Sequence, residues 1–183
     1  MTPKYRILLV SAAVLLVDQL SKWLIQSSME LHASLQVLGN FFRLTFVENP
    51  GMAFGLQLGN NRFFTVFAIL ASIVMAYYLL QLPMEQRLAR LALALVLGGA
   101  LGNLLDRLLR GKVVDFFDFE FFDLHLPSFQ LLSFRFPGYD LERWPVFNVA
   151  DIAVTIGMVL LLIVILFEKE DKTSMATDGE MVR

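Results

Sequence analysis

Four apolar stretches of the chain predict helices that cross a membrane. Residues 63–82 give the clearest signal, because they carry no charge over a length that matches one helical crossing of the hydrocarbon layer. Residues 91–105 are apolar apart from Asn103 and become long enough once their flanks are included, and residues 152–167 form another uncharged run. With a further stretch near the start, they predict an all-α membrane protein with four transmembrane helices at about 7–25, 63–82, 88–107 and 148–167.

The stretch near the start has two interpretations. Lys4 and Arg6 precede an apolar run, which is also the layout of a secretory signal peptide. No small-x-small cleavage site follows the run, however, and a signal peptide rarely continues into a segment such as Asp18 to Lys22. We therefore expect a retained helix over 7–25 and a four-helix bundle.

The two long segments between these helices, residues 26–62 and 108–147, predict small β-rich loops. Apolar and polar residues alternate in parts of both, as in residues 117–121, and a period of two is typical of strands. The second segment is rich in Phe, and aromatic side chains are favoured at headgroup depth, so the strands are expected at the membrane interface. A loosely ordered aromatic loop fits the same pattern.

Positive charges near the helix ends predict the orientation in the membrane. Lys and Arg residues divide evenly between the two sides of a four-helix arrangement. Those on the side of the termini lie in short segments, which weigh more in setting orientation. Both termini are therefore expected in the cytoplasm, and the long loops are expected on the periplasmic side. The tail at 169–183 is polar, shows no periodicity and is expected to be disordered.

Composition supports a membrane protein and excludes several kinds of site. Hydrophobic residues make up 57% of the chain against 17% charged residues, and the mean hydropathy is +0.63, which departs from the balance of soluble domains. The absence of Cys excludes disulfides, thiol nucleophiles and Cys-based metal sites, and two His residues leave little for a His-rich metal site or a Ser-His pair. A net charge of −2 gives no polybasic surface for nucleic acid. We expect a site without metal or cofactor and no nucleic-acid partner.

The polar residues within the helices are predicted to gather near one face of the membrane. Successive helices run in opposite directions, so the ends of the first and third helices lie on the same side as the start of the fourth. Ionisable residues are costly in lipid and usually point into the bundle, where they mark functional sites. The residues concerned are Asp18 and Lys22, then Asn103, Asp106 and Arg107, and then Asn148 and Asp151.

Spacing suggests structural roles for some of these residues. Asp18 and Lys22 are four positions apart and predict an ion pair, with Lys22 extending its ammonium outward. A Ser21–Lys22 hydrolytic dyad is a weak alternative, because adjacent helical residues point about 100° apart. Gly98 and Gly102 have the spacing typical of close helix packing in lipid.

The end of the third helix carries further pairs at helical spacing. Asn103 and Arg107 are four positions apart, so the amide and the guanidinium share a face. Asp106 is expected either to cap the helix end or to pair with Arg110.

Asp115 and Asp151 are the candidate catalytic pair. Asn148 fits the N-cap of the last helix, but Asp151 lies about one turn deeper, where capping explains less. Asp115 lies between apolar residues rather than in a charged run, although an ordinary exposed loop Asp is the alternative. Two carboxylates in a partly dry site can share a proton, so that one activates a water while the other polarises a carbonyl. This chemistry needs no His, Cys or metal.

Five short motifs follow one another along the chain. They are Asp18-Gln19-Leu20-Ser21-Lys22, Asn49-Pro50-Gly51-Met52-Ala53-Phe54-Gly55, Gly98-Gly99-Ala100-Leu101-Gly102-Asn103-Leu104-Leu105-Asp106-Arg107, Val113-Val114-Asp115-Phe116 and Phe147-Asn148-Val149-Ala150-Asp151. In this order on four predicted helices, over about residues 4–168, the pattern resembles the bacterial lipoprotein signal peptidase family (signal peptidase II).

The resemblance implies a multi-pass aspartyl endopeptidase of the bacterial inner membrane, with its active site near the periplasmic face. Such enzymes cut diacylglyceryl-modified prolipoproteins just before the lipidated Cys. The resemblance also implies Asp115 and Asp151 as the catalytic residues. The positions that match dyad support or substrate binding are Asp18, Lys22, Asn49, Gly51, Asn103, Arg107 and Asn148. We expect a monomer whose partners are its lipidated substrates and membrane lipid.

One segment departs from the family pattern, and two other classes of protein remain as alternatives. Residues 120–143 form a longer, Phe-rich stretch that is expected to reshape the substrate entrance. A small transporter or proton relay should carry polar groups toward both membrane faces, whereas the predicted cytoplasmic halves here are apolar. A non-catalytic assembly module would explain the glycines and aromatic residues but would leave the Asp and Asn residues without a purpose.

Overall fold

Two units make up the chain in the computed structural model, which describes residues 3–50, 61–121, 124–131, 134–136, 138–141 and 143–180. The helical unit comprises Met1–Ser21, Gly59–Gly111 and Val149–Arg183. The sheet unit comprises Lys22–Leu58 and Lys112–Asn148. The boundary between them crosses the first helix, so this helix contributes residues to both units.

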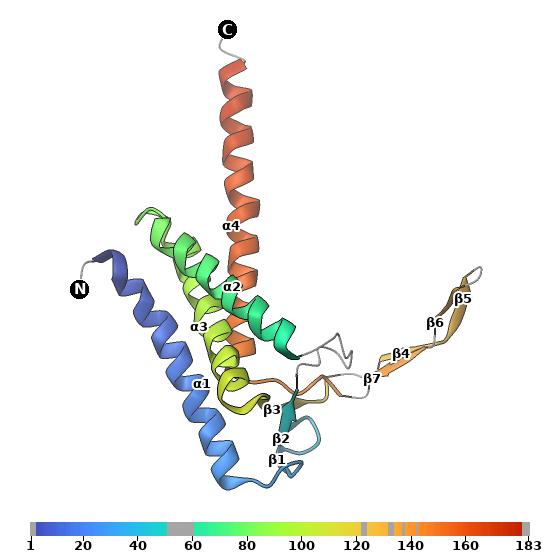
Figure 1. Cartoon of the computed structure of the whole chain (residues 1–183). Coiled ribbons are helices and arrows are strands. Elements are labelled where there is room, and N and C mark those ends of the chain that lie inside the picture. Colours follow the sequence, from blue (N-terminus) through green and yellow to red (C-terminus); the bar gives the residue numbers. More distant parts are fainter. Residues whose placement is uncertain are drawn as a thin grey trace. The chain divides into compact units, whose positions relative to one another are not determined.

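The helices begin within two residues of their predicted starts (Figure 1). A short 3-10 turn, η1 (Pro3–Ile7), leads into the first of them. The four helices are α1 (Leu8–Ser28), α2 (Asn61–Gln81), α3 (Arg87–Arg110) and α4 (Val149–Glu180). Within the helical unit, α3 packs against both α2 and α4.

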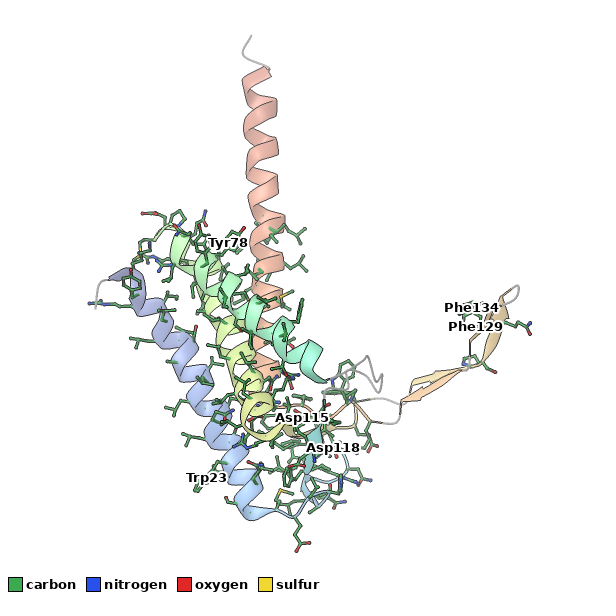
Figure 2. The ribbon with its side chains drawn as sticks, viewed as in Figure 1. Trp23, Tyr78, Asp115, Asp118, Phe129 and Phe134 are labelled. Atoms are coloured by element: carbon green, nitrogen blue, oxygen red, sulfur yellow. The ribbon has the colours of Figure 1, made fainter. Side chains whose placement is uncertain are left out.

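The helices of the helical unit are long and apolar, as predicted for a membrane protein. Lys4–Ser28, Arg87–Arg110 and Val149–Phe167 are each long and apolar enough to cross a membrane, and α2 contributes a shorter apolar segment, Thr65–Gln81. Large hydrophobic side chains such as Tyr78 on α2 are exposed on the surface of this unit (Figure 2). A soluble domain rarely exposes contiguous apolar surface, whereas lipid favours it.

Glycines allow α3 to approach its neighbours closely. A Cβ atom added at Gly98 would lie 2.8 Å from the carbonyl oxygen of Ser11 on α1. A Cβ atom at Gly102 would lie 2.5 Å from Oδ2 of Asp18. Neither position has room for a side chain, so the predicted role of these glycines in close helix packing is confirmed.

Three helices extend beyond their predicted ends, and the first of them, α1, continues to Ser28. α3 continues to Arg110 and stops where Gly111 adopts a left-handed conformation (φ 74°), with its N–H donating to the carbonyl of Arg107. α4 continues through the tail that was expected to be disordered and reaches Glu180. No Gly or Pro interrupts the stretch between Phe167 and Gly179, so local propensity favours continuation of the helix.

The sheet unit contains a three-stranded antiparallel sheet. Its strands are β1 (Ser34–Leu38), β2 (Phe42–Asn49) and β3 (Val113–Phe119), paired in that order. The strands come from the two long segments in which alternation predicts β-structure, so the prediction of small β-rich loops is confirmed and the loosely ordered alternative is wrong for these parts. The ring of Phe119 stacks on Phe42 at 4.5 Å and on Phe147 at 5.8 Å between centroids, which gives the sheet an aromatic cluster.

The Phe-rich stretch after β3 forms a nested hairpin. β4 (Leu124–Leu126) pairs with β7 (Tyr139–Leu141), and β5 (Phe129–Leu131) pairs with β6 (Phe134–Phe136), both antiparallel. Phe129 and Phe134 are exposed on this hairpin (Figure 2).

Candidate active site

Asp18 holds the start of α4 within the helical unit. Its side chain is fully buried, and its Oδ1 accepts a hydrogen bond from the backbone N–H of Ala150 at 3.0 Å. Gln19 donates to Oδ2 of the same carboxylate at 3.1 Å. A carboxylate near the first turn of a helix satisfies a free N–H and interacts favourably with the helix dipole. Asp18 therefore fixes the backbone residue that precedes Asp151.

Asp151 lies in the first turn of α4 and is half-buried. Its Oδ1 accepts a hydrogen bond from Nδ2 of Asn103 on α3 at 2.8 Å. The backbone carbonyl of Asn103 accepts in turn from Arg107 at 3.3 Å. The predicted cluster at the end of the third helix and the start of the fourth is therefore present, with the Asn103 amide on the candidate catalytic carboxylate.

Asp106 has a structural environment. It is fully buried and forms an ion pair with Arg110 one turn later, and it also accepts a hydrogen bond from Gln19 at 3.2 Å. The predicted pairing with Arg110 is confirmed. Gln19 bridges Asp18 and Asp106, which links α1 to α3, and spacing alone gave no sign of this role.

Asp115 lies on β3 in the sheet unit and is only 3% exposed (Figure 2). Burial contradicts the alternative of an ordinary exposed loop Asp. Two amides hold the carboxylate: Asn148 donates to Oδ1 at 2.6 Å, and Asn49 donates to Oδ2 at 3.3 Å. Asn49 reaches it because β2 runs antiparallel to β3, with Val47 opposite Asp115 in the register.

Asn148 is fully buried at the residue that precedes α4. Besides Asp115, its amide donates to the carbonyl of Val114 at 3.2 Å. The amide nitrogen is thus directed to β3, which is more than the N-cap role that its position suggests.

Lys22 is fully buried, and this contradicts the expectation that its ammonium extends outward. Asp18 and Lys22 share one face of α1 and both are buried, so this face is turned toward protein rather than lipid. The hydroxyl of Ser21 donates to the backbone carbonyl of Asp18 at 2.8 Å, a bond within the helix. Gly51, the remaining candidate, lies outside the described residues.

An ion-pair network in the sheet unit was not foreseen from the sequence. Asp118 on β3 accepts from Arg143 at 2.7 Å and from the hydroxyl of Thr45 at 2.5 Å (Figure 2). Arg143 also pairs with Glu120. The acidic alternation at Asp118 and Glu120 was visible, but the cationic partner lies more than twenty positions away along the chain, where spacing is uninformative.

The carboxylates therefore differ in their chemistry. Asp106 and Asp118 bind guanidinium groups through charge-assisted hydrogen bonds, which indicates a structural role. Asp115 and Asp151 are both oriented by Asn amides, which fix a carboxylate in place by hydrogen bonds. Within the described ranges, no group of three His, Asp or Glu side chains is arranged to hold a metal ion.

Comparisons with known proteins identify similar sequences and structures. A profile of the family described as signal peptidase (SPase) II matches residues 10–167. A lipoprotein signal peptidase from Moorella thermoacetica is 42% identical over 154 residues, covering 84% of this chain and 88% of that protein. One from Alteromonas mediterranea is 39% identical over 179 residues, covering 96% of this chain and 87% of that protein.

Solved structures of bacterial membrane enzymes have a fold similar to that of this chain. A bacterial membrane enzyme determined at 2.3 Å by the in meso method is similar with a TM-score of 0.74 and 32% identity, covering 91% of this chain and 90% of that one. A second bacterial membrane enzyme, at 1.9 Å, has a TM-score of 0.70 and 32% identity, with 87% and 92% covered.

Proposed function

Because the chain belongs to the signal peptidase II family, we propose that it is a membrane aspartyl endopeptidase that removes the signal peptide from diacylglyceryl-modified prolipoproteins. The bond that it cleaves is the one before the lipidated Cys. Asp115 and Asp151 are the two catalytic carboxylates in this proposal.

The observation that best supports the pairing of these two carboxylates concerns Asn148. Its amide nitrogen lies 2.6 Å from Oδ1 of Asp115, and it precedes Asp151 by three positions in the chain. Three peptide units span at most about 11 Å between Cα atoms. The short separation along the chain between Asp151 and the residue that binds Asp115 supports the proposed assignment of both carboxylates.

The proposed reaction is the addition of water to the scissile carbonyl. One carboxylate takes a proton from the water, whose oxygen attacks the carbonyl carbon, while the other, protonated, donates a hydrogen bond to the carbonyl oxygen. The tetrahedral intermediate then collapses, the C–N bond breaks, and the leaving amine takes a proton from the carboxyl that received it. In the proposal the two carboxylates act as a pair that shares one proton.

The polar residues around the pair have positioning roles in the proposal. Asn49 and Asn148 orient Asp115, whereas Asn103 orients Asp151. Asp18 anchors the N–H of Ala150 and so fixes the backbone beside Asp151. In the proposal, Lys22, Gly51 and Arg107 also support the catalytic pair or bind the substrate.

The proposed membrane arrangement has four crossings, of which α2 is one. The peptidase domain comprises residues 1–168, and both termini, with the tail at 169–183, lie in the cytoplasm. The active site lies near the periplasmic face of the bacterial inner membrane, and the protein acts as a monomer. The distribution of Lys and Arg over short and long segments supports this orientation.

The direct test uses the purified full-length protein in detergent micelles with a synthetic lipopeptide whose Cys carries a diacylglyceryl group. Mass spectrometry of the products should show a single cut before the lipidated Cys, and cleavage should continue in excess EDTA. The absence of cleavage, or a cut elsewhere, would contradict the proposed activity. Loss of cleavage with EDTA and its return with a divalent metal would contradict the two-carboxylate mechanism.

A further inference from the structure

Three arginines lie around a cavity in the helical unit. Arg6 belongs to η1, and Arg87 and Arg90 belong to the first turn of α3, which η1 contacts. The cavity has a volume of about 290 Å³, and its lining residues are Arg6, Ile7, Val10, Met84, Arg87 and Arg90. Among the described residues, three cationic side chains and no acidic one line this space.

Arg90 is the central feature of the cavity because it is charged and only 4% exposed. Its Nη2 donates to the backbone carbonyl of Lys4 at 2.6 Å, and its Nη1 contacts the sulfur of Met84. Its Nε is buried and has no hydrogen-bond partner among the described residues. A buried guanidinium without a carboxylate partner is costly, so an anion at this position would be stabilised strongly.

We propose that this cavity binds the phosphodiester headgroup of an anionic phospholipid. Guanidinium groups hold phosphate oxygens with two parallel hydrogen bonds, and basic pockets between membrane helices are suited to lipid headgroups. The buried Arg90 lines the cavity, and the exposed Arg6 and Arg87 supply charge at its edge.

The lining favours a lipid over free phosphate. Ile7, Val10 and Met84 contribute apolar surface beside the arginines, which suits a molecule that has both a phosphate and hydrocarbon. The volume corresponds to about ten water molecules at liquid density, which is more than a bare phosphate needs. The apolar surfaces of α1 and α3 begin at this same end, so acyl chains have helix surface to follow.

The site is separate from the candidate active site. Arg90 and Asn103 are thirteen positions apart on α3, which corresponds to about 20 Å along the helix axis. The proposal therefore stands independently of the proposed peptidase mechanism.

Native mass spectrometry of the full-length protein in detergent tests the proposal, with phosphatidylglycerol and phosphatidylcholine as probes. Wild-type protein should bind phosphatidylglycerol at least about tenfold more tightly, because the choline cation opposes three arginines. Arg6→Gln and Arg87→Gln should each weaken phosphatidylglycerol binding about fivefold, which corresponds to the usual effect of one cation near a membrane surface. Both residues are exposed, so these variants avoid the folding defect that Arg90→Gln risks.

Lys4→Gln is the matched control. It removes the same charge two positions from Arg6, but the Lys4 side chain does not line the cavity, so binding should change less than twofold. Equal binding of the two lipids would overturn the proposal. An equal loss in Lys4→Gln would also overturn it, because it would indicate unspecific charge attraction. Displacement of the lipid by an equal concentration of inorganic phosphate would overturn the assignment to lipid and identify free phosphate as the ligand.

Discussion

At the scale of single residues, the partner of each buried carboxylate indicates its role. Asp106 and Asp118 form ion pairs with arginines, and Asp18 accepts a backbone N–H at the start of α4. Asp115 and Asp151 are instead oriented by asparagine amides. In our proposal only the last two exchange protons during turnover, so the same substitution should have different effects at different positions.

Asp115→Asn and Asp151→Asn should each lower the rate of lipopeptide cleavage at least about a thousandfold, because each removes one proton-transferring group while it keeps nearly the same shape. Asp118→Asn is the matched control: it lies on the same strand and is buried, but its partners are Arg143 and Thr45. Its rate per folded molecule should stay within about tenfold of wild type. Cleavage rates and thermal unfolding of the purified variants give the comparison. Substantial activity in Asp115→Asn would refute the catalytic assignment.

At the scale of secondary-structure elements, the periodicity of the sequence predicts which helices and strands form. It does not predict which strands pair with each other. The uncharged runs predicted helix starts to within two residues, and Gly98 and Gly102 predicted close packing. Alternation in residues 117–121 predicted a strand, but a period of two carries no information about its partner. β2 and β3 are more than sixty residues apart, so their register and the bond between Asn49 and Asp115 follow from tertiary packing.

The end of α4 illustrates a second limit of the sequence. Polar composition in residues 169–183 predicts disorder, although no residue between Phe167 and Gly179 is a Gly or Pro that would prevent a helix. α4 continues to Glu180 because helix propagation adds one hydrogen bond for each residue that it fixes. Hydrophobic length measures the membrane span, which ends near Phe167, and not the length of the helix.

Gly99→Ala should destabilise the packing of α3 on α4. A methyl group there would overlap the carbonyl oxygen of Ala150 and lie 2.8 Å from Cγ2 of Val154. We expect a loss of roughly 1–3 kcal/mol in the free energy of unfolding, measured by denaturant titration in mixed micelles. Activity should fall as well, because Ala150 precedes Asp151. Leu109→Ala, on the exposed surface of α3, should change stability by less than about 0.5 kcal/mol. Equal effects of the two substitutions would show that close approach at Gly99 is unimportant.

At the scale of the whole molecule, the proposed function needs one group from each unit. Asp115 belongs to the sheet unit, whereas Asp151 belongs to the helical unit. Within its own unit, Asp115 is oriented by two asparagine amides and Asp151 by one. The proposed orientation places the sheet unit on the periplasmic side, and this can be measured directly because the chain contains no Cys.

Single Cys residues introduced at Ser34 and Ser128 should react with a membrane-impermeant thiol reagent added to intact spheroplasts. Both positions are exposed and belong to the sheet unit. Cys residues at Gln86 and Ser174 should react only after the cells are permeabilised. The reverse pattern would place the termini outside and would contradict the weight given to the short positively charged segments.

The lipid on the substrate should be required for rapid cleavage, because the proposed site lies at the level where a helix enters the membrane. Asp151 is the third residue of α4, about 3 Å along the helix axis from the first residue, and the hydrophobic span begins at the same point. A soluble peptide has to leave water to reach this depth, whereas each buried CH₂ group of a diacylglyceryl chain contributes about 0.8 kcal/mol to membrane partitioning. The lipid also fixes the height of the scissile bond beside the acyl chains.

We expect a peptide with an unmodified Cys to be cut at least about tenfold more slowly than the same peptide with the diacylglyceryl group, a difference of about 1.4 kcal/mol in barrier. Initial rates on the two peptides in one micelle preparation decide the question, and equal rates would indicate a general intramembrane protease that does not recognise lipid.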